Sequence, residues 1–231
     1  MIIGTGLIAS QFNDWWKDVD AIIFASGVSN SKEHSLSEYE REQKLVETFF
    51  STKKLFVYFS SCSIFDKTLD KSLYIKHKLK IERIIKNNFK NYLILRLPNV
   101  IANTKNPNTF FNYFYNAIVY QNKIQIQKNN IRYFLDVEQV EPMTRYIYKN
   151  RNEWNKTINM IFDDPVSIPK VTQLMEQAIG LVANKKIVDK GMHYIIPSNS
   201  FSKYKSKVFP TVKDDGYTEA IIKKYIKIIN K

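Results

Sequence analysis

The chain has one cysteine, Cys62, among its 231 residues, so it cannot form an internal disulfide or a cysteine-based zinc site. Its 6 glycines and 7 prolines are too few for a collagen-like or low-complexity protein. No apolar run reaches the length of about 18 residues that suggests a membrane span. Met1 leads into an apolar segment without a basic stretch, so no secretory signal is predicted. We therefore expect a cytoplasmic protein that does not associate with membranes.

Acidic residues are also scarce, because 22 Asp and Glu face 35 Lys and Arg and leave a net charge of +13. This balance favours anionic ligands. Nucleic-acid readers usually gather their basic residues into a stripe or an arm, whereas these lysines are spread along the chain. We expect a phosphorylated small molecule rather than nucleic acid as the partner. The three histidines, His34, His77 and His193, lack metal-ligand spacing, and no metal site is predicted.

Short apolar runs alternate with helical patterns, and this alternation is typical of an α/β fold with a parallel sheet covered by helices. Strands are predicted at residues 1–4, 19–25, 55–60 and 92–97. A capping-box pattern at Ser35 begins a helix that extends to about residue 50, and another helix covers about 72–87. Later segments predict an Asn-rich loop at 99–107, shorter strands and helices, and a surface loop at 198–212.

The first predicted strand leads through Gly4-Thr5-Gly6-Leu7-Ile8-Ala9 into a predicted helix. A G-x-G-x-x-A turn in this place lets pyrophosphate oxygens approach backbone N–H groups at a helix N-terminus, although ordinary tight turns share the pattern. The usual fingerprint has an acidic residue about 20 positions on, which holds the adenosine ribose. Phe24-Ala25-Ser26-Gly27 stands there instead. The ribose contact is therefore missing or made differently.

A second constellation consists of Ser61, Tyr74 and Lys78. Helical residues four apart share a face, so the Lys78 ammonium would stabilise the phenolate of Tyr74 for proton transfer. Ser61 ends a predicted strand at the sheet edge where open α/β folds bind ligands, and it would hydrogen-bond the same substrate oxygen. The alternative is an exposed helical Tyr–Lys pair. By the same patterns, Glu40, Arg41 and Glu42 form a charged helix face, and His77 faces solvent.

In this order the segments resemble the extended short-chain dehydrogenase/reductases that act on nucleotide sugars, the NAD(P)-dependent epimerase/dehydratase group. The resemblance is carried by residues 5–9, 20–27, 59–66, 72–79, 96–100 and 132–137. Residues 59–66 are similar to dTDP-4-keto-rhamnose reductases, and Ser60-Ser61-Cys62 is similar to GDP-fucose synthases. Cys62-Ser63 stands where the family's dehydratases have Asp-Glu, which disfavours dehydration. Cys62 itself is interpreted as a packing residue rather than a catalytic one.

The resemblance implies a Rossmann-like parallel sheet shortened at one edge, because the chain between the glycine turn and Val19 has room for one helix only. Residues 1–122 would form the nucleotide-binding core, re-entered by later elements, and residues 123–231 a small α/β substrate lobe. The implied function is reduction or epimerisation of a nucleotide-linked sugar with NAD or NADP. The alternative is a catalytically silent nucleotide-sugar-binding protein. A homodimer is one way to cover the exposed sheet edge.

The site residues that the resemblance implies fall into three groups. Ser61, Tyr74 and Lys78 would be catalytic. The cofactor would be held by Gly4, Gly6, Leu7, Ile8, Ala25, Ser26, Gly27, Ser60, Tyr74, Lys78 and Pro98. The substrate would be held by Ser63, Asn99 and Arg132, with the last two at its diphosphate.

Overall fold

A computed structural model describes residues 1–12 and 14–230, with the backbone alone at residues 199–200. The chain divides into two compact units, one of Met1–Leu97 and Glu138–Met160, the other of Pro98–Val137 and Ile161–Lys231. The assignment of nucleotide binding to residues 1–122 and of substrate binding to residues 123–231 stays a prediction. Among the described residues, no helix is both long and apolar enough to cross a membrane.

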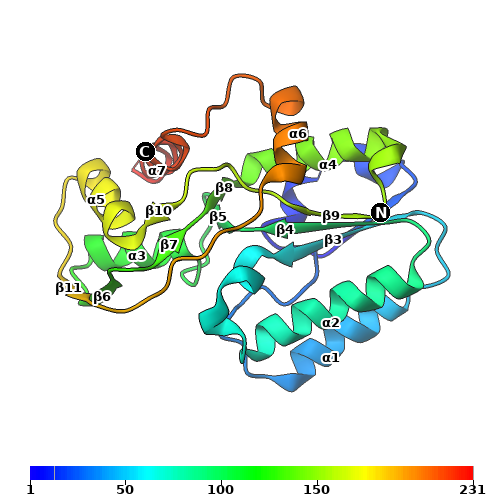
Figure 1. The fold of residues 1–231 in the computed structure, drawn as a ribbon, viewed down its shortest axis with the longest axis horizontal. Coiled ribbons are helices and arrows are strands. Elements are labelled where there is room, and N and C mark those ends of the chain that lie inside the picture. Colours follow the sequence, from blue (N-terminus) through cyan, green and yellow to red (C-terminus); the bar gives the residue numbers. More distant parts are fainter. Residues whose placement is uncertain (13, 231) are drawn as a thin grey trace. The chain divides into compact units, whose positions relative to one another are not determined.

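A five-stranded sheet forms the centre of the first unit, in the order β1-β2-β3-β4-β9, and all its strands are parallel (Figure 1). Every residue of β2 and β3 is buried, as expected for apolar runs without alternation. The α/β class and the parallel sheet are therefore confirmed. The strands are β1 (Ile2–Ile3), β2 (Ala21–Phe24), β3 (Leu55–Ser61), β4 (Tyr92–Leu97) and β9 (Lys156–Asn159).

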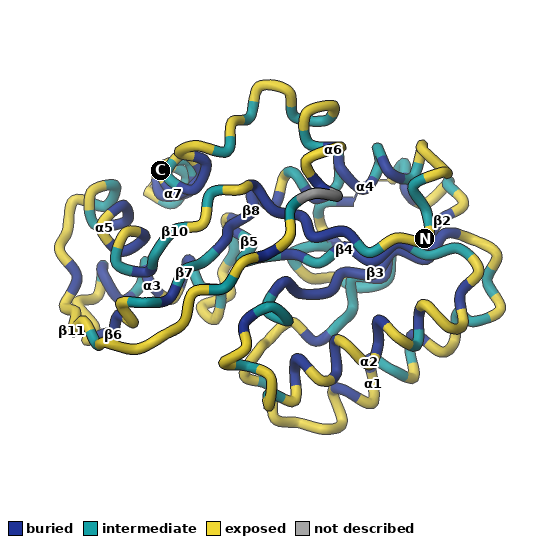
Figure 2. Tube along the Cα trace, viewed as in Figure 1, coloured by how far each residue is buried: buried dark blue, intermediate teal, exposed yellow. Residues whose placement is uncertain are grey.

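Helices α1 (Leu36–Glu47) and α2 (Leu73–Asn88) cover one face of this sheet, and α4 (Val140–Lys149) lies on the other (Figure 1). Their inward sides are buried and their outward sides exposed (Figure 2). Val46 of α1 and Ile81 and Ile85 of α2 pack onto aromatic residues of β2 and β3. Ser35 precedes α1 as predicted, but its hydroxyl makes no capping bond and instead lies 2.7 Å from the Ser37 hydroxyl.

The prediction of an α-helix after the glycine turn is wrong. Residues there form two short 3-10 helices, η1 (Ala9–Gln11) and η2 (Asp14–Lys17). Trp16 is fully buried, and its indole N–H donates to Oε1 of Glu141 at 2.6 Å. The Met1 amino group donates to the Trp16 carbonyl at 2.9 Å. These contacts with distant residues fix the segment in tight turns against the edge strand β1, which pairs with β2 alone within the described chain.

The second unit contains three two-stranded sheets and four α-helices in its described part. β5 (Asn99–Ile101) pairs with β8 (Phe134–Asp136), β6 (Ile124–Gln127) with β11 (Lys185–Val188), and β7 (Ile131–Arg132) with β10 (Val166–Ser167). The helices are α3 (Phe110–Val119), α5 (Ile168–Ile179), α6 (Asn199–Val208) and α7 (Tyr217–Ile229). The first unit also contains the 3-10 turns η3 (Cys62–Phe65), η4 (Lys67–Leu69) and η6 (Arg151–Glu153), and η5 (Val137–Gln139) lies where the chain passes from the second unit back to the first.

Two loop predictions in this unit are wrong. The segment 198–212 contains α6, because Phe201 and Tyr204, one helical turn apart, are both buried. The Asn-rich segment 99–107 begins with β5, because the Asn99 N–H donates to the Tyr133 carbonyl and continues a parallel ladder with β8. In both cases partners distant in sequence determine the local structure.

Asp136 anchors α7 to β8. Its carboxylate accepts the Tyr225 hydroxyl at 2.6 Å and the Lys224 ammonium at 2.7 Å, and the residue is only 6% exposed. We expect Asp136→Asn to lower the free energy of unfolding by about 2 kcal/mol, because a buried charge-assisted bond is weakened. Urea denaturation measures this. The exposed control Asp215→Asn should change stability by less than about 0.5 kcal/mol, and equal effects of both variants would contradict the anchoring role.

Candidate functional site

The residues predicted to bind a cofactor and perform chemistry in the first unit lie at the carboxyl edge of the sheet. β1 ends just before Gly4, β2 just before Ala25, and β3 at Ser61. Ile3 pairs with Phe24, and Phe24 with Tyr58, so β1 and β2 end level while β3 continues beyond them. Ligands of open parallel sheets bind outside this edge.

Gly4 brings the glycine turn against the loop that follows β2. Its φ is +117°, and a Cβ at this position would lie 2.4 Å from the Ala25 carbonyl oxygen, so only glycine fits. A Cβ on Gly6, by contrast, would meet no atom within 4 Å. Gly4 is therefore required by the packing of the chain itself, and there is open space beside Gly6.

Four successive amides of this turn, those of Thr5, Gly6, Leu7 and Ile8, have no acceptor within the described residues. These residues are exposed or half-buried. Consecutive N–H groups of this kind can bind an anion. A helix dipole cannot assist them, because the following segment is a single 3-10 turn rather than an α-helix.

Lys78, Tyr74 and Gly27 come together behind this edge. The Lys78 ammonium lies 5.8 Å from the centre of the Tyr74 ring. A Cβ on Gly27 would come within 2.9 Å of Lys78 Nζ, so the loop after β2 passes directly over the ammonium. Lys78 is only 2% exposed. The structure thus joins the predicted Tyr–Lys pair to the predicted cofactor loop.

Tyr74 is 7% exposed and packs against Val28, Tyr39 and Ile75. Its hydroxyl makes no hydrogen bond within the described residues. It is also not one of the enclosed polar atoms that lack a partner, so it keeps contact with solvent. Tyr74 therefore has a mostly buried ring and a hydroxyl that can still reach a ligand.

Glu42 is a central residue of this site, and its assignment to an exposed charged face was wrong. The residue is completely buried. Its Oε1 accepts the Tyr58 hydroxyl at 2.6 Å and the Lys78 ammonium at 3.2 Å, and its Oε2 accepts the Val28 N–H at 2.6 Å. The Lys78 ammonium also donates to the Tyr58 hydroxyl at 3.0 Å. One carboxylate thus connects α1, α2, β3 and the loop after β2.

His77 was predicted to face solvent, and this was also wrong. It is 7% exposed, and its ring centre lies 4.7 Å from that of Tyr39. Its Nε2 lies 3.0 Å from Glu42 Oε2, although the geometry is not that of a hydrogen bond.

The sequence contained a signal that Glu42 is buried. Glu42 is three residues after Tyr39 and four before Val46, and both of these residues lie on the buried face of α1.

The surroundings of Glu42 determine its charge. Burial alone would raise the pKa of this carboxyl group, but the Lys78 charge, the adjacent His77 ring and the hydrogen bonds from Tyr58 and Val28 lower the pKa to about 2. Glu42 is therefore ionised at neutral pH. Its negative charge balances the positive charge of Lys78.

The hydroxyls of Ser60 and Ser61, at the end of β3, make hydrogen bonds to different residues. Ser61 Oγ accepts the Ser63 N–H at 3.1 Å, and its own hydrogen has no acceptor among the described residues, as suits the predicted donor. Ser60 Oγ donates to Glu82 at 2.7 Å, and Arg96 also holds that carboxylate.

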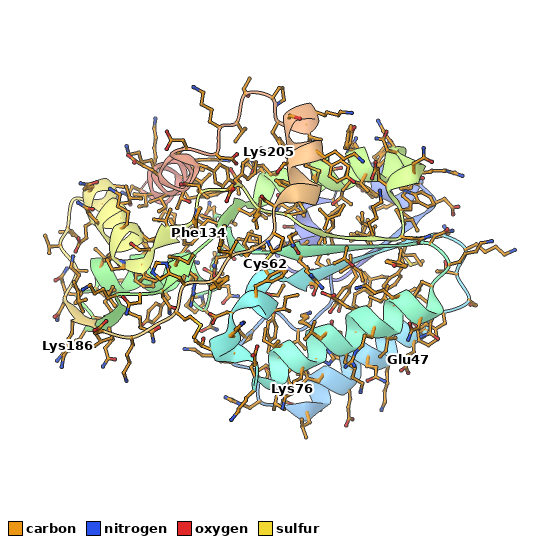
Figure 3. All side chains as sticks on the ribbon, in the orientation of Figure 1. Glu47, Cys62, Lys76, Phe134, Lys186 and Lys205 are labelled. Carbon is orange, nitrogen blue, oxygen red and sulfur yellow. The ribbon has the colours of Figure 1, made fainter. Side chains whose placement is uncertain are left out.

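Cys62 directly follows β3 (Figure 3). Its thiol donates to the Arg96 carbonyl at 3.3 Å, and burial raises its pKa. These properties support the interpretation of Cys62 as a packing residue, because a reactive cysteine needs access and a lowered pKa.

The remaining predicted residues belong to the second unit. Pro98 is half-buried directly before β5. The side-chain amide of Asn99 donates to the Tyr133 carbonyl at 3.1 Å. Arg132 Nη1 donates to the Ile131 carbonyl at 2.9 Å, and its guanidinium lies 5.9 Å from the centre of the Tyr194 ring. Their roles toward a cofactor or substrate stay predictions.

No family model and no curated protein sequence matches the chain. Solved structures do match. UDP-glucuronic acid 4-epimerase from Bacillus cereus, in complex with UDP-glucuronic acid and NAD, has a TM-score of 0.71 at 19% identity, over 98% of this chain and 79% of that one. A UDP-galactose 4-epimerase has a TM-score of 0.71 at 15% identity, over 92% and 78%.

A dTDP-4-dehydrorhamnose reductase from Clostridium acetobutylicum also has a TM-score of 0.71, at 13% identity over 98% of this chain and 86% of that one. The chain has the fold of these nucleotide-sugar enzymes. The fold predicted from the resemblance is therefore confirmed, whereas identities this low say nothing about individual residues.

Within this epimerase-type fold, the phosphate part of a nicotinamide dinucleotide fits the residues that are present. The turn has amides without acceptors at Thr5–Ile8 and open space beside Gly6. The adenosine part has less support, since β1 is the sheet edge and no acidic residue follows β2 directly. A dinucleotide in this site would therefore depend more on its phosphate contacts.

The low pKa of Glu42 predicts a specific response of stability to acid. Its folded pKa of about 2 is below the ordinary 4.5, so its stabilising contribution is complete above pH 4.5 and is lost as the pH falls toward 2. We expect Glu42→Gln to lower the free energy of unfolding by about 3 kcal/mol at pH 7, because buried Lys78 loses its counter-charge. The difference from wild type should shrink as the pH falls below 4.5.

Urea denaturation at several pH values measures this difference. Glu40→Gln is the matched control, because Glu40 is on the same helix and is exposed. The control should be within about 0.5 kcal/mol of wild type. A constant difference between wild type and Glu42→Gln from pH 7 to pH 3 would rule out the ionised, paired state of Glu42.

Proposed function

We propose that the protein reduces or epimerises the sugar of a nucleotide sugar with NAD or NADP. The observation that carries this proposal is the Tyr74 hydroxyl. It reaches solvent and has no hydrogen-bond partner among the described residues, while its ring lies beside the buried Lys78 ammonium. The neighbouring loop at Gly27 and the free amides after Gly4 suit a dinucleotide. The fold, shared with epimerases and a reductase, supports the same assignment.

Each residue has a definite task in the proposed reaction. Tyr74 gives a proton to the carbonyl oxygen of a keto sugar during reduction, or takes one from a hydroxyl in the reverse direction. Ser61 donates a hydrogen bond to the same oxygen. Lys78 keeps a positive charge beside the Tyr74 ring, and Glu42 holds Lys78 in place. A bound nicotinamide would provide or accept the hydride.

The proposed binding residues follow from the resemblance. The cofactor would contact Gly4, Gly6, Leu7, Ile8, Ala25, Ser26, Gly27, Ser60, Tyr74, Lys78 and Pro98, and the substrate Ser63, Asn99 and Arg132. The Ser60 hydroxyl already donates to Glu82, so its contact with a cofactor would come from its backbone or as an acceptor.

A second candidate is a protein that binds a nucleotide sugar without redox chemistry. The charge of Lys78 is balanced by Glu42, which weakens its effect on Tyr74. The sheet also lacks strands beyond β1 within the described chain. Such a protein would bind a nucleotide sugar saturably and would have no affinity for NADH or NADPH.

Calorimetry with NADH, NADPH and a panel of UDP-, GDP-, CDP- and dTDP-linked sugars separates the two candidates. For the enzyme, we expect Tyr74→Phe to lower turnover by about a thousandfold, because the proton donor is removed. Its affinities for cofactor and nucleotide sugar should stay within about twofold of wild type. Once the panel has identified a substrate, loss of NADH absorbance measures turnover of a reductase, and chromatographic separation of the two epimers measures turnover of an epimerase, which consumes no net NADH.

Tyr39→Phe is the matched control, because Tyr39 packs in the same cluster and its hydroxyl donates to the Glu33 carbonyl at 2.8 Å. We expect this variant to keep wild-type turnover. Undiminished turnover of Tyr74→Phe would refute the role of Tyr74, and nucleotide-sugar binding without NADH or NADPH affinity would favour the second candidate.

A further inference from the structure

Arg41 contacts the loop that follows β2, which itself packs against the glycine turn, although its position in a charged helix sequence suggested only a solvated surface. Its Nη2 donates to the Ser26 carbonyl at 3.2 Å, and its Nη1 donates to the Ser26 hydroxyl at 3.3 Å. Ser26 in turn adjoins Gly4, since a Cβ there would lie 3.1 Å from the Ser26 nitrogen. Ser26 therefore connects the guanidinium to the turn whose Thr5–Ile8 amides have no acceptor among the described residues.

The turn needs positive charge from elsewhere. In dinucleotide folds an α-helix N-terminus contributes about half a positive charge at the pyrophosphate, but here only a 3-10 turn of three residues follows. Burial of a diphosphate against neutral amides alone would leave two negative charges without a counter-ion. Lys78 does not provide one, because it is only 2% exposed and its ammonium already donates to Glu42 and Tyr58.

The contacts of Arg41 suit a residue that supplies positive charge to a diphosphate at the glycine turn. Its Nε is paired with Glu38 Oε2 at 2.9 Å, which steadies the side chain while Nη1 and Nη2 face Ser26. The side chain is 44% exposed, so a ligand can reach it. A planar guanidinium can also bind two phosphate oxygens at once.

We propose that Arg41 binds the pyrophosphate of the dinucleotide at the glycine turn and replaces the missing helix dipole. This inference rests on the proposed function for the identity of the ligand. The anion site itself, made of the Thr5–Ile8 amides, Ser26 and Arg41, rests on geometry alone.

Calorimetry at low ionic strength with NADH, NADPH and inorganic pyrophosphate tests the proposal, since salt screens an exposed charge. We expect Arg41→Gln to weaken NADH, NADPH and pyrophosphate about tenfold each, and Arg41→Lys to lose less because it keeps the charge. Lys44→Gln is the matched control, since it removes one exposed charge from the same helix. It should change each affinity by less than about twofold. Unchanged melting temperatures would show that the variants are folded.

The outcomes separate this proposal from the proposed function. Pyrophosphate binding that depends on Arg41, with no NADH or NADPH affinity in wild type, would support the anion site and refute the cofactor assignment. A loss restricted to NADPH would overturn the proposal, because Arg41 would then contact the 2′-phosphate. Equal losses in Arg41→Gln and Lys44→Gln, or no pyrophosphate binding by wild type, would also overturn it.

Discussion

The site depends on one buried ion pair, between Glu42 and Lys78. A carboxylate removed from water loses several kilocalories per mole of hydration, which only well-placed partners can offset. Glu42 has such partners on α2, on β3 and in the loop after β2, and it is itself on α1. A shift of any of these elements would break either the ion pair or a hydrogen bond of a buried carboxylate. The same interaction therefore stabilises the first unit and fixes Lys78 beside Tyr74.

The pair also limits how strongly the charge of Lys78 can stabilise a phenolate at Tyr74. An isolated ammonium 5.8 Å from the Tyr74 ring centre would interact with a phenolate by about 3 kcal/mol at an effective dielectric constant of about 20. The Glu42 carboxylate, 3.2 Å from that ammonium, cancels much of this attraction. In the proposed reaction, Tyr74 would thus depend more on its position and on the Ser61 hydroxyl than on the charge of Lys78.

The sequence predicted those features that depend on local pattern, and it failed where contacts are distant. Strands β2, β3 and β4 were predicted because a strand buried on both faces needs a continuous apolar run. The helix expected after the glycine turn does not form, because Trp16 contacts Glu141, which is 125 residues away in the chain. Glu42 was predicted to be exposed because it is charged, whereas its position between Tyr39 and Val46 on the buried face of α1 determines its burial.

The shortened sheet connects these observations. A dinucleotide fold with full-length edges distributes its binding between adenosine, phosphate and nicotinamide contacts. With β1 reduced to two residues at the edge, the adenosine part has little sheet to lie against. The segment after the glycine turn forms η1 and η2, with Trp16 buried against α4, in place of the α-helix whose dipole would face the phosphates. Both losses have the same physical consequence for the proposed cofactor. Its affinity would come from direct hydrogen bonds and side-chain charge near the glycine turn, and such affinity falls with salt.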